Sequence, residues 1–163
     1  MTCNKLVRTG IGYDIHRLLK GSKLIIGGIE INFEKGSVGH SDGDALIHSI
    51  VDALLGAASL GDIGKYFSSE TEEWKNEKSE VFLKFSTNKI RSIGYEIVHI
   101  DTNIIIQEPK ILKYRDEIIE NLSQIMEIKK NQISVKAKTA DFLGSIGQGL
   151  GWECQAVATI YKK

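Results

Sequence analysis

A long apolar stretch, Ala45–Ala58, constrains the fold of this chain more than any other segment. It follows the turn-forming sequence His40-Ser-Asp-Gly-Asp44. A side-chain oxygen of Ser41 or Asp42 is well suited to accept from the free amides of a first helical turn, so we predict that one of them is the N-cap. The helix is apolar almost all round, and such a helix belongs in the interior of a protein.

Three ionisable residues lie in this helix or directly before it, and their spacing places them on one face. Asp44, His48 and Asp52 are each four residues apart, and a step of four turns only about 40° around a helix. An unpaired buried polar group costs roughly 1–3 kcal/mol, so each residue needs a partner. His48 fits either a core histidine bonded to a carboxylate or a metal ligand, and we expect Asp52 to orient its ring.

The composition indicates one globular domain spanning residues 1–163, with 42% hydrophobic residues. Its 21 basic and 21 acidic side chains balance, which gives no support to binding of nucleic acid or of a membrane surface. No apolar run approaches a membrane span and no signal-peptide core is present, so we expect a cytoplasmic, bacterial-type location. Cys3 and Cys154 lack metal-type spacing and are expected to be free thiols.

The remaining chain alternates strand and helix patterns. We predict a strand over 7–16, a hairpin over 23–32 that turns at Gly27-Gly28, a helix over 79–93, a strand over 95–107, a helix from Pro109 to about 127, strands over 132–138 and 152–161, and a short helix that opens at 139–141. The fold class is therefore α+β, a two-layer α/β arrangement with a mixed sheet and helices on one face. The last strand, with Ala156, Val157, Ala158 and Ile160, is expected to face a partner, so the chain should self-associate through sheet faces.

A first candidate site combines the predicted strand over 7–16 with the buried helix. Asp14 and His16 are two residues apart and so point to the same side of an extended chain. With His48 they offer one oxygen and two nitrogens, and three protein ligands with an open fourth position are the usual catalytic zinc arrangement. A solvated strand end is the alternative for Asp14 and His16, because spacing alone does not bring the strand to the helix.

A second candidate site lies where the strand over 132–138 ends. Lys136, Lys138 and Thr139 precede a predicted helix start, and helix N-termini bind phosphate through free amides. The carboxylate of Asp141 beside a phosphate suits a divalent cation such as Mg²⁺. An ordinary N-cap with surface lysines explains the same residues.

Two loops complete the pattern. Gly61-Asp-Ile-Gly64 reads as a helix stop followed by a sharp turn, which either caps the helix or presents amides and one carboxylate at the surface. The stretch Ser68–Lys78 is polar and without period, so we expect a mobile loop.

Several motifs, in this order, resemble the 2-C-methyl-D-erythritol 2,4-cyclodiphosphate synthase family. They are Gly12-Tyr-Asp-Ile-His16, His40-Ser-Asp-Gly-Asp44 with His48, Asp52-Ala-Leu-Leu-Gly-Ala-Ala58, Gly61-Asp-Ile-Gly64 and Lys136-Ala-Lys-Thr139. The resemblance runs from about Val7 to Ile160. It implies conversion of 4-diphosphocytidyl-2-C-methyl-D-erythritol 2-phosphate to the cyclic diphosphate and CMP, by attack of the 2-phosphate on the β-phosphorus, in non-mevalonate isoprenoid synthesis.

The resemblance also implies a homotrimer with active sites between subunits, whose partners cover the open sheet face. One Zn²⁺ per subunit would be held by Asp14, His16 and His48, and Asp141 would help hold Mg²⁺ or Mn²⁺ on the substrate diphosphate. His40 and Thr139 would be catalytic. The implied substrate-binding residues are Asp14, His16, His40, Ser41, Asp62, Ile63, Gly64, Ser69, Ile106, Pro109, Lys110, Leu112, Lys138, Thr139, Asp141, Ser145 and Gln148.

The chain departs from the family pattern at two places. Phe67-Ser-Ser-Glu-Thr71 replaces Phe-Pro-Asp-Thr-Asp, so Ser69 stands where the family has a carboxylate that could hold a substrate hydroxyl. Ser145, Gln148 and Leu150 replace the Phe, Arg and Glu that are frequent in relatives. The Arg and Glu lie near the trimer axis in relatives that hold an isoprenoid diphosphate there, so we predict no tight binding of such an anion.

Two other functions fit the same residues. A zinc-dependent hydrolase of a nucleotide or phosphoester would use the same three ligands, but it needs a general base, for which only Asp44 or Asp52 is at hand. A non-catalytic trimeric metal-binding protein would keep the metal and show no turnover. Product analysis distinguishes them, because the synthase yields a cyclic diphosphate and CMP, whereas the hydrolase yields a linear product.

Overall fold

A mixed five-strand sheet, in the order β4-β1-β7-β5-β6, organises the computed structural model, which describes residues 6–163. Its strands are β1 (Val7–Lys20), β4 (Lys35–Val38), β5 (Tyr95–Ile105), β6 (Ile133–Lys138) and β7 (Gly151–Lys162), and a separate hairpin pairs β2 (Leu24–Ile26) with β3 (Ile29–Ile31). The α-helices are α1 (Ala45–Ala57), α2 (Ile63–Tyr66), α3 (Ser79–Ser92), α4 (Arg115–Met126) and α5 (Gly144–Gly147), with short 3₁₀ turns η1 (Glu72–Trp74), η2 (Leu112–Tyr114) and η3 (Lys130–Gln132).

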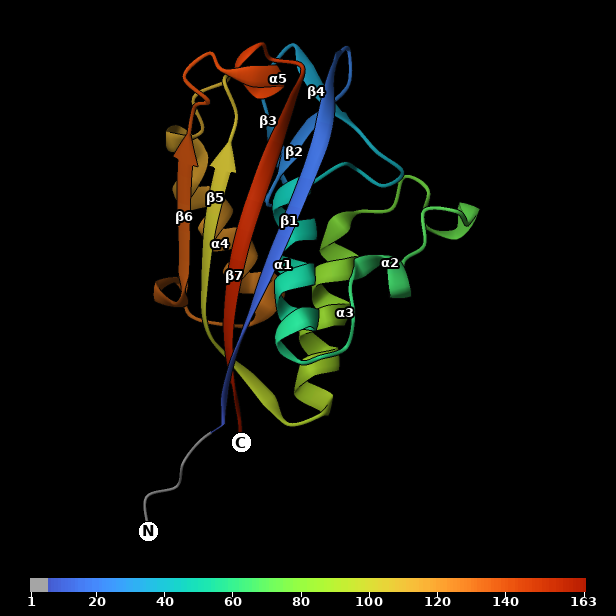
Figure 1. The fold of residues 1–163 in the computed structure, drawn as a ribbon, viewed down its shortest axis with the longest axis vertical. Helices are drawn as coiled ribbons and strands as arrows, with labels where there is room; N and C mark the ends of the chain where they lie inside the picture. The colour runs from blue at the N-terminus through green and yellow to red at the C-terminus, as the bar shows by residue number, and fades with distance from the viewer. Residues whose placement is uncertain (1–5) are drawn as a thin grey trace.

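The layers confirm the predicted α+β class. Figure 1 shows α1, α3 and α4 on one face of the sheet, with α5 at the opposite end from the C-terminus. Only β5 and β6 run parallel, and the other pairs in the sheet are antiparallel. No helix in the described part of the chain is long and apolar enough to cross a membrane.

Two glycines let α1 lie directly against β1. A Cβ added at Gly12 would stand 1.9 Å from the carbonyl oxygen of Ser49, and one at Gly10 would stand 2.1 Å from that of Ala53. Both distances lie far inside ordinary van der Waals contact. The paired glycines therefore set how close helix and strand come, and with that the place of His48 over β1.

The start of α1 differs from the prediction. The N-cap is Asp44, whose Oδ1 accepts from the amide of Ile47 at 3.0 Å, and neither Ser41 nor Asp42 caps this helix. Its Oδ2 accepts from the amide of Gly28 at 2.7 Å. Gly28 lies in the predicted two-glycine turn, so Asp44 fixes the β2–β3 hairpin to the helix and is fully buried.

Several predicted element boundaries need correction. β1 extends to Lys20, α4 begins at Arg115 after η2, and α5 begins at Gly144 instead of at 139–141. In α3, Phe82 and Ile90 are buried, whereas Phe85 and Ile93 are 39% and 38% exposed. The boundaries of β1, α4 and α5 were misjudged because residue propensities and hydrophobic periodicity indicate that an element exists more reliably than where it begins and ends.

The sheet face opposite the helices carries exposed apolar side chains. Ile11 is 75% exposed, and Tyr13 and Ile15 are about half exposed. In β7, Val157 lies on this open face, whereas Ala156, Ala158 and Ile160 are buried against the helices, so the expectation that all four face a partner was wrong. Cys154 is a buried free thiol, and Cys3 lies outside the described residues.

Candidate metal centre and adjoining cavity

Three potential ligands from β1 and α1 meet at one point. Asp14 and His16 project from the same side of β1, and His48 reaches them from the first turns of α1. The Asp14 Oδ2 atom lies 2.8 Å from His48 Nδ1 and 3.1 Å from His16 Nδ1. One ligand atom from each residue lies within 4.8 Å of the others, and no other such group of His, Cys, Asp or Glu occurs among residues 6–163.

The electrostatics of this cluster favour a bound cation. Burial by itself raises the pKa of Asp14, but its interactions with His16 and His48 outweigh burial and lower the pKa to about 2. Burial also works against a charged His48, yet the hydrogen bond and negative charge of Asp14 raise the pKa of this imidazole. A half-buried carboxylate thus stays ionised at neutral pH and attracts positive charge.

The donor set fits a metal ion. His16 Nδ1 is buried and has no geometrically well-directed hydrogen-bond partner among residues 6–163, although it lies at ion-pair distance from Asp14, 3.1 Å. Together with the nearby carboxylate and the second imidazole, this unpaired nitrogen makes three potential metal ligands near one point. One oxygen and two nitrogens suit zinc with an open fourth position.

A cavity of about 310 Å³ opens onto the cluster. The residues that line it and that the sequence had indicated are Asp14, His16, His40, Ser41, His48, Ile63, Gly64 and Ser69. The sequence did not indicate its aromatic wall of Phe67, Trp74 and Phe82, in which the rings of Phe67 and Phe82 lie 4.4 Å apart. Trp74 belongs to η1, so the stretch predicted to be a mobile loop contributes a short 3₁₀ turn and part of the wall.

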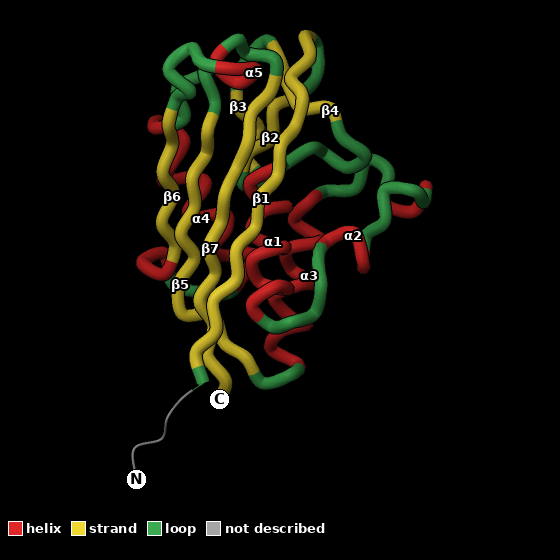
Figure 2. The backbone as a smooth tube through the Cα atoms, in the orientation of Figure 1, coloured by secondary structure: helices red, strands yellow, loops and turns green. Residues whose placement is uncertain are grey.

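Two loops that contribute lining residues to this cavity run side by side (Figure 2). The amide of Asn76 donates to the carbonyl of His40 at 2.8 Å, and the amide of Asp42 donates to the carbonyl of Glu77 at 3.1 Å. The His40 ring is held in the same way, with Nε2 2.7 Å from the carbonyl oxygen of Thr71. The polar loop therefore positions the predicted catalytic histidine.

Asp52 does not orient His48 as predicted. Its Oδ1 accepts from the amide of Ile63 at 2.8 Å, and it thereby anchors the turn after α1 at the cavity edge. Asp62 caps α2 by accepting from the amide of Lys65 at 3.0 Å and does not line the cavity. The turn is thus both a helix cap and part of the cavity rim, where it contributes Ile63 and Gly64.

The second group of predicted residues lies at the end of β6, the edge strand on the opposite edge of the sheet from β4. Asp14 aligns through β7 and β5 with Ala137 of β6, three strand spacings away, which is about 14 Å. Thr139 does not line the cavity with His40, so one chain does not bring these two together. Thr139 and Asp141 also lie in a loop before α5, not at a helix N-terminus, and Lys136 pairs with Asp101 at 2.6 Å.

Ile106, another of the predicted substrate-binding residues, lies beside this second group. The amide of the buried Ile106 donates to the carbonyl of Lys138 at 3.0 Å. Pro109 follows a cis peptide bond, Lys110 is exposed, and Leu112 is 70% exposed in η2. Ser145 and Gln148 line two further hollows around α5.

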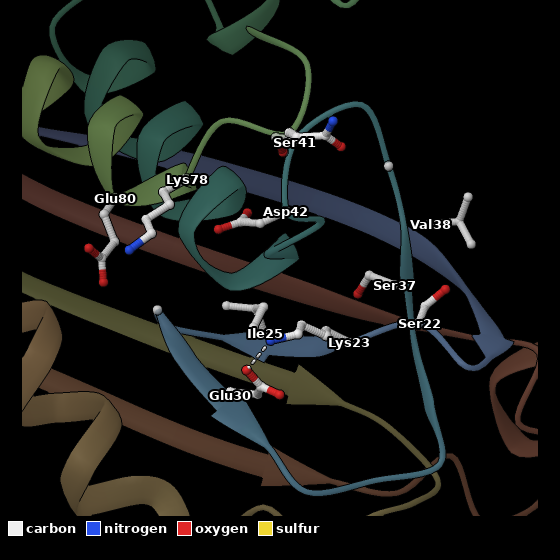
Figure 3. A pocket seen from close by; sticks show the side chains of 13 residues that line it. Ser22, Lys23, Ile25, Glu30, Ser37, Val38, Ser41, Asp42, Lys78 and Glu80 are labelled. Atoms are coloured by element: carbon white, nitrogen blue, oxygen red, sulfur yellow. Dashed lines mark hydrogen bonds and ion pairs between the residues drawn. The ribbon is translucent and has the colours of Figure 1, made fainter.

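A second cavity, of about 690 Å³, is larger than the one at the metal centre and lies beside it (Figure 3). It lies between the hairpin, the loop that carries Ser41 and Asp42, and the start of α3. Lys23 and Glu30, both on the hairpin wall of this cavity, form an ion pair of 2.8 Å. It contains none of the three candidate ligands and meets the smaller cavity only at Ser41, so size does not mark the reactive site here.

Comparison with known proteins supports one assignment. The model of the YgbB family matches residues 7–161. A 2-C-methyl-D-erythritol 2,4-cyclodiphosphate synthase of Treponema denticola is 49% identical over 143 residues, which cover 88% of this chain and 89% of that protein. The solved IspF–CDP complex of Plasmodium falciparum superposes with a TM-score of 0.86 at 39% identity, covering 96% of this chain and 97% of that one. The bifunctional IspDF of Campylobacter jejuni gives a TM-score of 0.95 at 34% identity, with 98% of this chain matched to 43% of that chain.

Fold and site together define an α+β protein with a candidate three-donor metal centre in an open cavity. The match over nearly the whole chain makes the assignment specific. The chain belongs to the YgbB family of 2-C-methyl-D-erythritol 2,4-cyclodiphosphate synthases, and its function is that lyase reaction in the non-mevalonate pathway to isoprenoids.

Proposed function

We propose that this chain holds Zn²⁺ with Asp14, His16 and His48 and uses it to cyclise 4-diphosphocytidyl-2-C-methyl-D-erythritol 2-phosphate. The convergence of these three side chains beside an open cavity is the observation that carries the proposal. Zinc there would supply a positive charge between two phosphates that must approach each other. A cytidine nucleotide is consistent with the solved relatives, two of which are described as CDP complexes.

The active site is proposed to form between subunits of a homotrimer. His40 and Thr139, the two proposed catalytic residues, stand at opposite sides of the sheet in one chain, so a neighbouring copy has to supply one of them. Phe142 and Leu143, which follow Thr139 and Asp141, are 77% and 73% exposed. Exposed apolar residues beside an incomplete site fit an interface that completes it.

Each part of the substrate has proposed partners. Ile106, Pro109, Lys110 and Leu112 would surround the cytidine, and Asp62, Ile63 and Gly64 would meet the erythritol hydroxyls, with Ser69 nearby. Lys138, Thr139 and Asp141 would face the diphosphate, with Mg²⁺ or Mn²⁺ held at Asp141. Ser145 and Gln148 complete the proposed set near α5.

The proposed reaction needs no side-chain nucleophile. An oxygen of the 2-phosphate attacks the β-phosphorus, the bond from that phosphorus to the bridging oxygen of the α-phosphate breaks, and CMP leaves with the electron pair. His40 and Ser41 would hold the attacking phosphate, and Thr139 would donate a hydrogen bond to the charge on the diphosphate. Both reacting groups are in one molecule, so alignment can contribute an effective molarity worth about 7–11 kcal/mol.

Phosphorus NMR of the authentic substrate with the protein, Zn²⁺ and Mg²⁺ tests the proposal. The expected spectrum shows two coupled phosphorus signals of a cyclic diphosphate together with CMP, and chelation of the metals should abolish both. A linear phosphate product would indicate the hydrolase, and unchanged substrate would indicate a binding protein. Mass measurement of the native protein should give three chains, and a stable active monomer would contradict the shared site.

A further inference from the structure

On the side of the ring away from Asp14, His48 forms a hydrogen bond with a residue that lies far away in the sequence. Its Nε2 atom lies 2.9 Å from the Oγ atom of Ser79, the first residue of α3. Ser79 is fully buried. The hydroxyl of Ser41 is also near, at 3.1 Å, but Ser41 is only half buried. Ser79 is thus the enclosed partner of the ring nitrogen that points away from Asp14.

Ser79 is itself fixed by Asp42. One carboxylate oxygen of Asp42 accepts from the Ser79 amide at 3.0 Å, and the other makes a short contact with the Ser79 hydroxyl. Both polar groups of Ser79 are therefore bound by a single carboxylate. Asp42 stands on the wall of the larger cavity, which Lys78 also lines (Figure 3).

The chemistry of these groups gives the hydrogen bonds a direction. A carboxylate only accepts, so the Ser79 hydroxyl must donate to Asp42. Its oxygen then accepts from His48, which places a proton on Nε2 of that ring. Nδ1 lies 2.8 Å from the Asp14 carboxylate in this structure, and with Nε2 protonated it is the ring nitrogen that would give its lone pair to a metal in place of that contact.

We propose that Ser79 and Asp42 are positioning residues for the metal centre, which fix the tautomer and the rotation of the His48 ring through a directed hydrogen-bond relay. This inference rests on the proposed metal binding, and it goes beyond that proposal by assigning a role to two residues outside the ligand set. Outer partners of ligating histidines typically change metal affinity by about 10–100-fold when removed.

Zinc affinity, measured by competition with a chromogenic chelator, tests the relay. Ser79→Ala is expected to weaken zinc binding by about 10–100-fold, and Ser79→Thr, which keeps the hydroxyl, should restore most of it. Ser86→Ala is the matched control, because Ser86 is a fully buried serine on the same helix whose hydroxyl has no hydrogen-bond partner in the described part of the chain. Ser86→Ala should leave the affinity unchanged.

Nitrogen-15 NMR of zinc-loaded wild-type protein supplies a second readout that does not depend on any variant folding. The His48 proton should reside on Nε2, and a proton on Nδ1 would overturn the relay. A loss for Ser79→Ala well below tenfold, or an equal loss for Ser86→Ala, would also overturn it. If the wild-type protein takes up no zinc, the proposed metal binding and the relay both fail. If it takes up zinc but Ser79→Ala has no effect, only the relay fails.

Discussion

Substitution of Gly12 by alanine should disturb both the stability and the metal centre of this protein. The added Cβ would stand 1.9 Å from the Ser49 carbonyl oxygen and 2.9 Å from the Ala53 amide nitrogen. Both are backbone atoms of α1, so rotation of a side chain cannot relieve the clash. The helix has to move away from β1 by more than about 1 Å, because ordinary contact begins at 3.4 Å.

The size of the effect follows from this displacement. Overpacking of a well-packed core typically costs about 1–3 kcal/mol, and a clash between two backbones belongs at or above the upper end of that range. His48 precedes Ser49 on the displaced helix, whereas Asp14 and His16 stay on β1. Metal–ligand distances tolerate only about 0.2 Å, so zinc affinity should fall together with stability.

Urea unfolding with and without zinc provides the assay, and Gly56→Ala provides the control. Gly56 lies on α1 too, but the nearest atom to an added Cβ is 4.0 Å away. There alanine should stabilise the protein by about 0.5–1 kcal/mol through its higher helix propensity. The reasoning is refuted if Gly12→Ala stays within about 1 kcal/mol of wild type and binds zinc equally well.

Two further predictions follow from buried groups. Burial raises the pKa of Asp44 from 3.8 to about 6. The folded state therefore holds this proton more tightly, and the stability contributed by the neutral acid, complete below pH 3.8, is lost as pH rises through about 6. Between pH 3.5 and 7, the free energy of unfolding of metal-free wild-type protein should fall by up to about 3 kcal/mol relative to that of the Asp44→Asn variant, as measured by urea unfolding. A difference between the two proteins that does not change with pH would contradict this. Burial also raises the pKa of the Cys154 thiol far above its ordinary value, so in a Cys3→Ser protein a thiol reagent at pH 8 should react only on unfolding; rapid labelling of the folded protein would count against the buried position.

Local patterns in the sequence were sufficient for the main elements and for the three candidate ligands. The apolar run of α1, the two-glycine turn and the i, i+2 spacing of Asp14 and His16 each depend on neighbours in the chain. Spacing left open whether β1 meets α1, the family resemblance implied that it does, and the structure confirms it.

Contacts between distant segments account for what the sequence analysis missed. Asp44 is the N-cap of α1 and also accepts from the Gly28 amide of the hairpin, a contact that the local sequence does not indicate. Asp52 accepts from the amide of Ile63 instead of binding His48. Ser79 lies 31 residues after His48 and belongs to no recognisable motif. The inward face of β7 was misjudged because a run of apolar residues hides the alternation that would show which side faces the helices.

The central claim is that Asp14, His16 and His48 hold one zinc ion beside the cavity. Anomalous diffraction at the zinc edge, on crystals of the zinc-loaded protein, tests it most directly. The account predicts one peak per chain, with one carboxylate oxygen and two imidazole nitrogens at about 2.0–2.2 Å. A zinc peak at any other group of residues, with these three side chains not coordinating it, would contradict the account.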